Sequence, residues 1–453
     1  MRKPNILLLT VFLLAGTLLF GQDPALESYI KEGLESNLAL KQIQADYQKS
    51  LKALQSAKGL FFPDIGIDAR YTKAEGGRII EFPVGDLLNP VYSTLNQLTQ
   101  TNTFPQLENE NFPFYRPTEH ETKLSLLQPV YNPKIIYNYQ IAKEMTRIDA
   151  VDIQIYKREL IKEIKTAYYN YQKTVGLMQL VDNTRLLLEE NIRVSKSLFA
   201  NDKVTSDVVY RSEADLEQLN VRKAEVVKSK KMARAYFNFL LNRPLDTPVE
   251  ELEITGNVPV VLAAQDSVTN YTSDNREELE QLEYYQEISR KYKALSQSEN
   301  YPSIAIALNY GFQGEEYSFT KDDDFLLASV VLRWNLFQGM KNRANVQQAK
   351  IAQHQLELKQ LEVQKQLDLQ IISAHQDLIA SLQAVEAARA QVVSLKKAFE
   401  VMEQKYINGQ ALPLEYSDAR TNMTTGEANL IIAIYDVKIK EAELERATAA
   451  YQL

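Results

Sequence analysis

In two segments near residue 300 every second side chain is apolar, and this pattern limits the folds open to the chain. In residues 303–313 every even-numbered position is apolar, whereas the odd-numbered positions are small or polar. Residues 325–337 repeat the alternation after a short acidic loop at 314–324. Side chains alternate across a β-strand, so each segment has one apolar face and one polar face. The pair predicts a β-hairpin with lipid on one side and water on the other.

A weaker hairpin pattern lies nearer the N-terminus. Residues 63–73 alternate well, whereas residues 121–131 alternate less well because Leu127 interrupts the pattern. The long segment between them carries five prolines and little periodicity, which predicts irregular structure. Loops of this length are usually functional or mobile.

The two hairpins belong to two diverged copies of one pattern. Residues 62–65 (FPDI) match residues 301–304 (YPSI) at an offset of 239, whereas Phe199 matches Tyr406 at an offset of 207. The first copy therefore carries 32 more residues between its strands. Each copy reads helix, strand, loop, strand, very long helix, turn and helix, and this shared order is the main evidence for the repeat.

Each copy predicts an unusually long helix. Apolar residues in the second copy recur at alternating spacings of three and four up to Tyr406, which is the seam of a coiled coil. About 65 residues at ~1.5 Å each predict a helix of roughly 100 Å. Short turns near 201–207 and 408–413 then reverse the chain into helical hairpins. The expected seam of the first copy comprises Ala167, Tyr171, Thr174, Met178, Val181, Leu188, Ile192 and Phe199.

Residues 1–21 have the features of a secretory signal peptide. Arg2 and Lys3 precede an apolar stretch that is too short for a comfortable membrane span, and we expect cleavage near Gly21–Gln22. An uncleaved anchor helix is the alternative. Cleavage removes two cations and no acids, so the formal net charge falls from −8 to −10, which disfavours nucleic-acid binding. No later apolar run is long enough for a spanning helix, so membrane entry requires β-strands.

The composition and the motifs exclude several classes of site. The chain has no cysteine, which excludes disulfides, thiolate metal sites, thiol nucleophiles and a lipid anchor on cysteine. No P-loop, nucleophile elbow, zinc motif or dinucleotide fingerprint is present, so we expect no enzyme and no cofactor. The three histidines, His120, His354 and His375, fit packing or surface roles better than metal ligation.

Four strands cannot close a barrel, and an open sheet edge in hydrocarbon leaves costly unpaired amides. Copies of the chain must therefore share one barrel. Two copies would give eight strands and a filled interior, whereas three would give twelve strands and a channel. We favour a cyclic homotrimer, and four copies remain an alternative. The polar strand faces would put Arg70, Lys123 and Arg333 in the lumen, and strand ends would place Tyr71, Tyr310, Phe312 and Trp334 in an aromatic girdle.

With these features the chain resembles the TolC-like outer-membrane channel proteins of Gram-negative efflux and type I secretion systems. The resemblance rests on the twofold repeat, on the helix–strand junctions at 62–63 and 301–302, on the strand–helix junctions at 127–131 and 334–339, and on the tip segment 406–419. It implies a homotrimer with a twelve-stranded barrel in outer-membrane lipid and a periplasmic α-barrel. It also implies docking to a periplasmic adaptor and, through it, to an inner-membrane pump. Segments around 242–272 and both termini would form a belt around the α-barrel.

The resemblance also suggests roles at the tip of the second repeat. Tyr406, Gly409, Glu415 and Asp418 occupy the places of the family's tip tyrosine, turn glycine and two carboxylates. A spacing of three residues puts Glu415 and Asp418 on one helix face, where symmetry would build acidic rings that favour cations. An ordinary solvated helix face is the alternative reading.

One position departs from the family pattern. The family's closing network includes an arginine two residues after the turn glycine, and this chain has Ala411 there. We therefore expect other closing contacts, involving Lys203 or Asp207 in the first repeat's tip. Structural roles suffice for Gly409, which suits a positive φ angle, and for Pro413, which suits the first turn of the returning helix.

The expected architecture is mainly α with a small transmembrane β part. The expected segments are a signal peptide (1–21), a periplasmic helix (22–62), hairpin 1 with a long extracellular loop (63–131), helical hairpin 1 (132–242), an equatorial segment (243–275), a second periplasmic helix (276–301), hairpin 2 (302–337) and helical hairpin 2 (338–453). The expected function is a passive conduit gated at its helix tips. A periplasmic coiled-coil scaffold without a channel is the alternative, and an adaptor does not fit the duplicated pattern.

Overall fold

The computed structural model describes residues 24–252 and 273–451. The chain divides into two compact units. The helical unit comprises the residues up to 48, residues 147–284 and the residues from 356 onwards, and the strand unit comprises residues 49–146 and 285–355. The expected signal peptide lies outside the described residues and stays a prediction.

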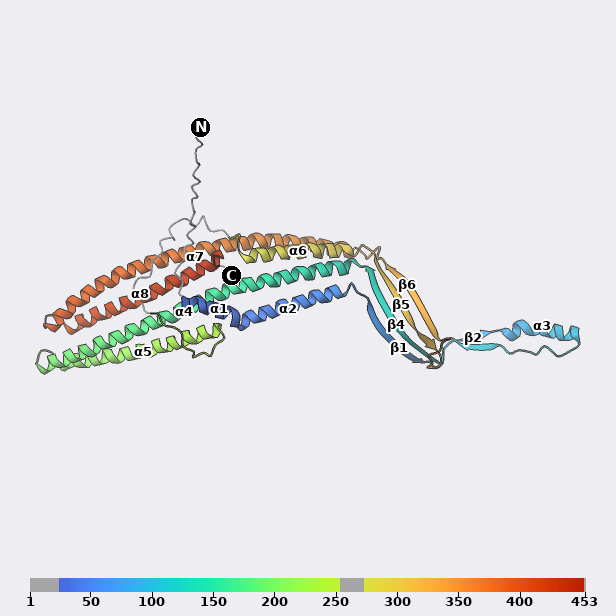
Figure 1. Ribbon diagram of the computed structural model, residues 1–453, viewed down its shortest axis with the longest axis horizontal. Coiled ribbons are helices and arrows are strands. Elements are labelled where there is room, and N and C mark those ends of the chain that lie inside the picture. Colours follow the sequence, from blue (N-terminus) through green and yellow to red (C-terminus); the bar gives the residue numbers. More distant parts are fainter. Residues whose placement is uncertain (1–23, 253–272, 452–453) are drawn as a thin grey trace, which may run out of the picture. The chain divides into compact units, whose positions relative to one another are not determined.

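Four antiparallel strands form one sheet in the order β1–β4–β5–β6 (Figure 1). Their bounds are β1 (Asp64–Lys73), β4 (Thr118–Tyr131), β5 (Ser303–Gly314) and β6 (Asp324–Arg333). Both predicted strand pairs are confirmed, and β4 pairs with β5 to join the two repeats. The prediction that the last strand reaches residue 337 is wrong: β6 ends at Arg333, after which the Trp334 indole nitrogen donates a hydrogen bond to the Asn300 carbonyl at 2.9 Å.

The register of this sheet separates two faces across all four strands. Ile67 lies opposite Leu124, which lies opposite Tyr310, which in turn lies opposite Leu326. Directly paired residues point to the same face, so these four side chains form one apolar row. Ile67 is 76% exposed and Leu326 is 74% exposed. The apolar face is therefore uncovered in the single chain.

The prediction of irregular structure between the first two strands is wrong. Residues 74–117, here called the appendage, contain strands β2 (Ile79–Phe82) and β3 (Glu110–Pro113), which pair, and helix α3 (Val84–Thr99). Pro83 immediately precedes α3, where a missing amide hydrogen costs nothing. Pro90 lies inside the helix. The prediction from the five prolines failed because the appendage is held together by side-chain hydrogen bonds. Asparagine side chains of α3 bind the segment that follows the helix, and such contacts produce no apolar periodicity in the sequence.

The remaining helices follow the predicted twofold repeat. The first copy has α1 (Pro24–Ser36), α2 (Leu38–Gly59), α4 (Pro133–Ala200) and α5 (Ser206–Leu240), and the second has α6 (Glu277–Ser298), α7 (Lys341–Ile407) and α8 (Pro413–Thr448). Helices α4 and α7 have 68 and 67 residues. At ~1.5 Å per residue each is about 100 Å long. Each forms an antiparallel hairpin with the helix that follows it (Figure 1).

A single helix was expected before β1, but it is broken between α1 and α2 at Asn37. The Asn37 side chain accepts a hydrogen bond from the Leu40 amide and donates one to the Leu240 carbonyl, both at 2.9 Å. Asn37 therefore caps α2 and attaches it to the end of α5.

The predicted seam of the second hairpin is confirmed. Ile371, Ala374, Leu378 and Val385 of α7 are buried in one cluster with residues of α8. The first seam is confirmed only in part, because Phe199 is 48% exposed. Near the first tip the buried position is Ser195 instead. A polar seam residue does not register in a search for apolar periodicity.

Two general properties follow from the described residues. None of their helices combines the length and the apolar character needed to cross a membrane. Within the same residues, no group of three or more acidic, histidine or cysteine side chains could hold a metal ion.

Candidate functional site

The turns that end the two helical hairpins lie close together at one end of the helical unit (Figure 1). In the second turn Gly409 has a φ of 70°, a conformation that favours glycine. Pro413 is the first residue of α8. One Glu415 carboxylate oxygen accepts a hydrogen bond from the Leu412 amide at 2.9 Å. Glu415 therefore satisfies an unpaired amide at the start of α8.

Tyr406 joins the two hairpins. Its ring stacks on Tyr416 of α8, with centroids 4.7 Å apart, and it is only 3% exposed. Its hydroxyl lies 3.1 Å from the Ser195 hydroxyl on α4, which in turn lies 3.1 Å from the Ser212 hydroxyl on α5. This chain of hydroxyls connects three helices at the tips. Burial raises the pKa of Tyr416 to about 12, so the Tyr416 hydroxyl stays uncharged near neutral pH.

An ion pair makes a second connection between the hairpins. The Arg420 guanidinium on α8 donates to an Asp215 carboxylate oxygen on α5 at 2.7 Å. The Ser417 hydroxyl donates to the same oxygen at 3.1 Å. The Arg420 side chain is 6% exposed and that of Asp215 is 29% exposed. Asp215 therefore neutralises a buried cation from the opposite hairpin.

Apolar packing surrounds these polar contacts. Phe399, Tyr406, Tyr416 and Met423 form a buried cluster in the second hairpin. Three residues of α4 pack against it, namely Leu187, Val194 and Leu198. The tips are therefore held together by an apolar cluster, a hydroxyl chain and one ion pair.

A hollow of about 310 Å³ opens beside this contact. Residues of α4, α5 and α8 line it, together with Tyr406. One lining residue is Asn191, and its side-chain amide oxygen (Oδ1) is buried without a hydrogen-bond partner among the described residues. The hollow thus combines aromatic, charged and unsatisfied polar groups, the mixture expected of a surface that receives another polypeptide.

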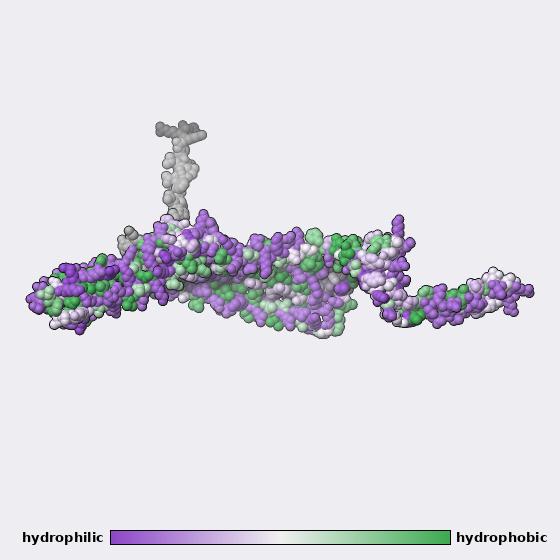
Figure 2. All heavy atoms as spheres, turned by 90° about the horizontal axis from the view of Figure 1, so that it is seen from below, coloured by the Kyte–Doolittle hydropathy of each residue, from purple (hydrophilic) through white to green (hydrophobic). Residues whose placement is uncertain are grey.

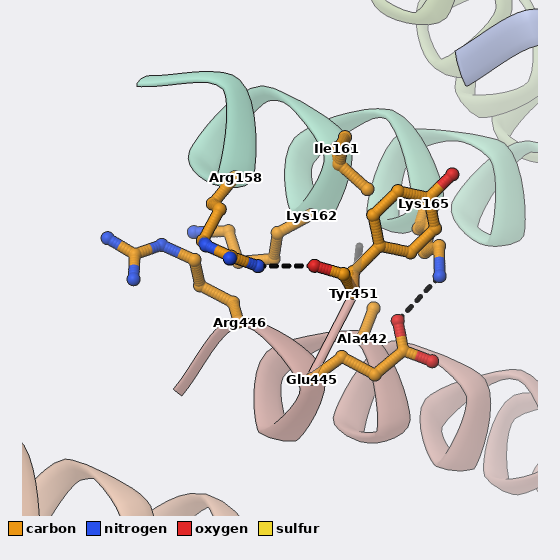
Figure 3. Close-up of a pocket in the computed structure, with 8 residues that line it drawn as sticks. All are labelled: Arg158, Ile161, Lys162, Lys165, Ala442, Glu445, Arg446 and Tyr451. Carbon is orange, nitrogen blue, oxygen red and sulfur yellow. Dashed lines mark hydrogen bonds and ion pairs between the residues drawn. The ribbon is translucent and has the colours of Figure 1, made fainter. Parts of the chain in front are cut away.

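A second polar cluster lies where the end of the chain meets α4 (Figure 3). Arg158 donates hydrogen bonds to the carbonyls of Ala449 and Tyr451. Lys165 lies 2.5 Å from a Glu445 carboxylate oxygen and 4.7 Å from the centre of the Tyr451 ring. The cavity among these residues has about 10 Å³, room for one water molecule. The cluster therefore joins the C-terminal segment to the first repeat and offers no space for a larger ligand.

The described parts of the expected belt also contact α4. The Gln172 side chain exchanges two hydrogen bonds with the backbone of Glu250 and Leu252. The Tyr451 hydroxyl donates to Glu27 of α1 at 3.0 Å. The rest of the expected segment, residues 253–272, lies outside the described residues, so the belt stays a prediction.

On the sheet, the predicted lumen residues fall on the polar face. Arg70 and Lys123 both contact Glu121, at 3.3 and 2.9 Å. Arg333 lies at the opposite end of the sheet, paired with Ser303. The polar face therefore carries a cluster of two cations around one carboxylate at the end next to the appendage.

The predicted girdle residues divide between the two ends of the same sheet. Tyr71 lies near the end of β1 that adjoins the appendage. The rings of Tyr310 and Phe312 lie 6.0 Å apart. Trp334 follows β6 at the other end. His120 is buried beside Tyr317, with ring centres 4.9 Å apart.

Known proteins are similar to this chain in sequence and in architecture. Residues 270–450 match the family model described as outer membrane efflux protein. TolC of Escherichia coli K12 is 20% identical over 449 residues, which cover 91% of this chain and 79% of TolC. The chain is therefore similar in sequence to outer membrane efflux proteins, and the match to the family model covers residues 270–450.

Solved structures of membrane proteins have the same fold. CusC superimposes with a TM-score of 0.76 at 13% identity, covering 94% of this chain and 92% of CusC. VceC of Vibrio cholerae superimposes with a TM-score of 0.73 at 14% identity, covering 94% of this chain and 96% of VceC. The TolC-like fold therefore extends over nearly the whole chain.

Besides Tyr406, the residues expected at the aperture lie near the two tip turns. Glu415 and Asp418 are exposed on α8. Asp207 is exposed on α5, where it contacts Thr205 and, at 3.6 Å, Arg211 of its own tip. Within the single chain the partners of Asp207 lie in the same hairpin, and its expected part in closing the tips stays a prediction. The aperture itself stays a prediction.

The residues that do connect the tips were missed by the sequence reasoning. They are Ser195, Ser212, Asp215 and Arg420. One signal was available: Arg420 follows Tyr416 by four residues and precedes Met423 by three, which is seam spacing. A charged residue on a predicted seam needs a buried partner. Nothing in the local sequence identified that partner as Asp215, 205 residues away.

Proposed function

We propose that this chain is the outer-membrane channel of a tripartite efflux or type I secretion system. It acts as a passive homotrimeric conduit from the periplasm to the exterior, and a pump supplies the energy. The observation that carries this proposal is a two-faced sheet whose outer strands, β1 and β6, each keep one unpaired edge. In hydrocarbon every such edge must be paired.

Three copies satisfy that requirement. Strand β1 of one copy pairs with β6 of the next, which closes twelve strands around a water-filled interior. The exposed row through Ile67 and Leu326 then faces lipid, and the charge cluster around Glu121 faces the lumen. With the signal peptide that the sequence predicts, the long helical hairpins would lie in the periplasm. A soluble scaffold would leave the apolar face uncovered.

The test is the state of the purified protein in mild detergent. We expect a trimer by native mass spectrometry, extraction only by detergent, and stable conductance in planar bilayers. Unheated samples should migrate on gels as a compact oligomer, since a closed barrel resists detergent. A protein that stays in aqueous buffer as an elongated oligomer would support the scaffold alternative. A monomer with an intact sheet would exclude the shared barrel.

The helix tips would form the periplasmic mouth and the docking surface for an adaptor. The hollow beside Tyr406 supports this assignment because it lies between the two hairpins and exposes polar groups. The capping role of Glu415 leaves one of its oxygens free of the Leu412 amide, so the carboxylate can still contribute negative charge at the mouth.

Neutralising the aperture acids should weaken block of the channel by divalent cations. In the variant Glu415→Gln/Asp418→Asn, the proposed rings lose six charges per trimer, and a ring of carboxylates is what attracts cations. Glutamine keeps an acceptor for the Leu412 amide, so the start of α8 is preserved. Bilayer recordings at increasing cation concentration measure the effect, and Glu386→Gln, an exposed acid far along α7, is the control. Block as strong as in the parent channel would remove the rings from the proposal.

A further inference from the structure

The appendage, residues 74–117, has no counterpart of similar size in the second repeat, where residues 315–323 join β5 to β6. It is a folded element rather than a loose loop. Asn89 exchanges two hydrogen bonds with the backbone of Leu107, both at 2.8 Å. Asn96, two helical turns further, does the same with Phe104 at 2.7 and 3.0 Å. These amide side chains bind the returning segment along one side of α3.

The opposite side of α3 is apolar and uncovered. Leu87, Val91 and Leu98 recur at spacings of four and seven, so they share one face of the helix. Leu98 is 76% exposed and Leu87 is 64% exposed. Figure 2 shows hydrophobic side chains on the surface of the appendage among polar ones. We call this face the α3 stripe, made of Leu87, Val91 and Leu98.

The β2–β3 ribbon is also uncovered. Ile80 lies opposite Phe112, and both are exposed, as is Phe82. An isolated two-stranded ribbon is marginally stable in water, and exposed apolar surface of this kind marks an interaction site. Within one chain the α3 stripe and the ribbon both remain exposed, so they do not cover each other.

We propose that the α3 stripe of one copy packs on the Ile80–Phe112 face of the ribbon of the neighbouring copy, so that three appendages form a collar at the outer mouth of the channel. The proposal rests on the homotrimer of the proposed function. A stripe that meets a ribbon is a heterologous contact, and threefold rotation closes such contacts into a ring.

The reach of the appendage fits this arrangement. Twelve strands about 4.8 Å apart and tilted by about 40° form a barrel roughly 25 Å across, so equivalent points of neighbouring copies lie about 20 Å apart. Helix α3 has 16 residues and is about 24 Å long. Each appendage can therefore span to the next. Attachment to one barrel also keeps the copies at an effective concentration in the millimolar range.

Charge favours a second copy over an anionic lipid surface. The appendage carries five acidic residues and only two basic ones, Arg78 and Arg116. Binding to anionic lipid relies on clusters of basic residues, and none is present. The two arginines flank the ribbon, with Arg78 just before β2 and Arg116 after β3, whereas Asp86 lies in the first turn of α3. Packing of one copy's α3 on the next copy's ribbon would bring Asp86 towards these arginines.

Cysteine cross-linking tests the collar, because the chain has no cysteine of its own. In Leu98→Cys/Phe112→Cys we expect a short bis-maleimide to convert most of the membrane-inserted protein into covalent dimers and trimers. Either single variant should stay monomeric on denaturing gels, since the contact is heterologous. The matched control, Gln97→Cys/Phe112→Cys, moves the cysteine by about 100° around α3 and should cross-link poorly.

The outcomes separate the collar from the channel. Native trimers without cross-links in the double variant would overturn the collar and leave the channel intact, whereas monomers in mild detergent would overturn the proposed function. In a third outcome, lipid vesicles protect the Leu98→Cys side chain from reaction with maleimide and the double variant does not cross-link. This outcome would identify lipid as the occupant of the α3 stripe and would also overturn the collar.

Replacing residues 76–115 by Gly-Ser-Gly should keep the trimer but lower the temperature at which it dissociates. An unchanged dissociation temperature would count against the collar.

Discussion

Asp215→Asn is expected to weaken the contact between the two helical hairpins by about 3 kcal/mol. The change keeps the shape of the side chain but leaves the Arg420 cation, 6% exposed, without its carboxylate. Removing one partner of a buried ion pair costs about 3–5 kcal/mol, because the remaining charge is uncompensated. The lower end applies here, since Asp215 is partly exposed. Hydrogen exchange of the tip amides, followed by mass spectrometry, measures the loss as faster exchange in the first turns of α5 and α8, which contain Asp215 and Arg420.

A matched control separates this effect from ordinary surface charge. Glu213 pairs with Lys196 at 2.9 Å within the first hairpin, and both side chains are about half exposed. Exposed pairs of this kind contribute at most about 1 kcal/mol, so Glu213→Gln should change tip exchange little. The double variant Asp215→Leu/Arg420→Met should recover most of the loss, because it removes the buried charge altogether. Equal exchange in Asp215→Asn and the parent protein would show that the ion pair does not hold the tips.

The same variant bears on the proposed gate. If the tips of a trimer close the periplasmic mouth, loosening one hairpin from the other should raise the fraction of time that the channel conducts. Bilayer recordings of Asp215→Asn should then show longer openings than the parent or Glu213→Gln. Faster exchange at the tips without longer openings would place the gate elsewhere.

Acid should destabilise the helical unit through Glu278. Its carboxylate contacts the guanidinium groups of Arg276 at 2.7 Å and Arg446 at 2.8 Å. Burial alone would raise the pKa of Glu278, but these two arginines outweigh it and lower the pKa from 4.5 to about 2. A group with a lowered folded-state pKa stabilises the fold above its unfolded pKa and loses that contribution as pH falls. The stabilisation is therefore complete above pH 4.5 and lost toward pH 2.

The expected size of this contribution is on the order of 2–3 kcal/mol, since the side chain of Glu278 is 21% exposed and solvent screens part of the interaction. Glu278→Gln should lower the melting temperature at pH 7 and flatten its fall between pH 4.5 and pH 2, as followed by circular dichroism. Glu283→Gln, an exposed neighbour on α6, should melt like the parent at every pH. A Glu278→Gln protein with the parent's pH profile would assign the acid sensitivity to other carboxylates.

The sequence by itself determined the two-faced strands and the long hairpins of this protein. Alternation in residues 303–313 predicted β5 almost to the residue, because the period of a strand is two and a single shift would turn its apolar side chains to the wrong face. The seam through Ile371 and Leu378 was equally readable, because burial of α7 against α8 repeats every three or four residues. Side chains that are buried at regular intervals along a strand or helix appear in the sequence as apolar residues with the same spacing.

Only the tertiary structure decided the appendage and the contact between the tips. Asn89 and Asn96 stabilise the folded appendage, residues 74–117, through paired amide hydrogen bonds. Such bonds do not require regularly spaced apolar residues, so a search for apolar periodicity does not detect them. Ser195, Asp215 and Arg420 join two hairpins from positions about 200 residues apart. Such polar contacts depend on which helices become neighbours, and that choice is made by packing of the whole hairpins rather than by any local run of residues.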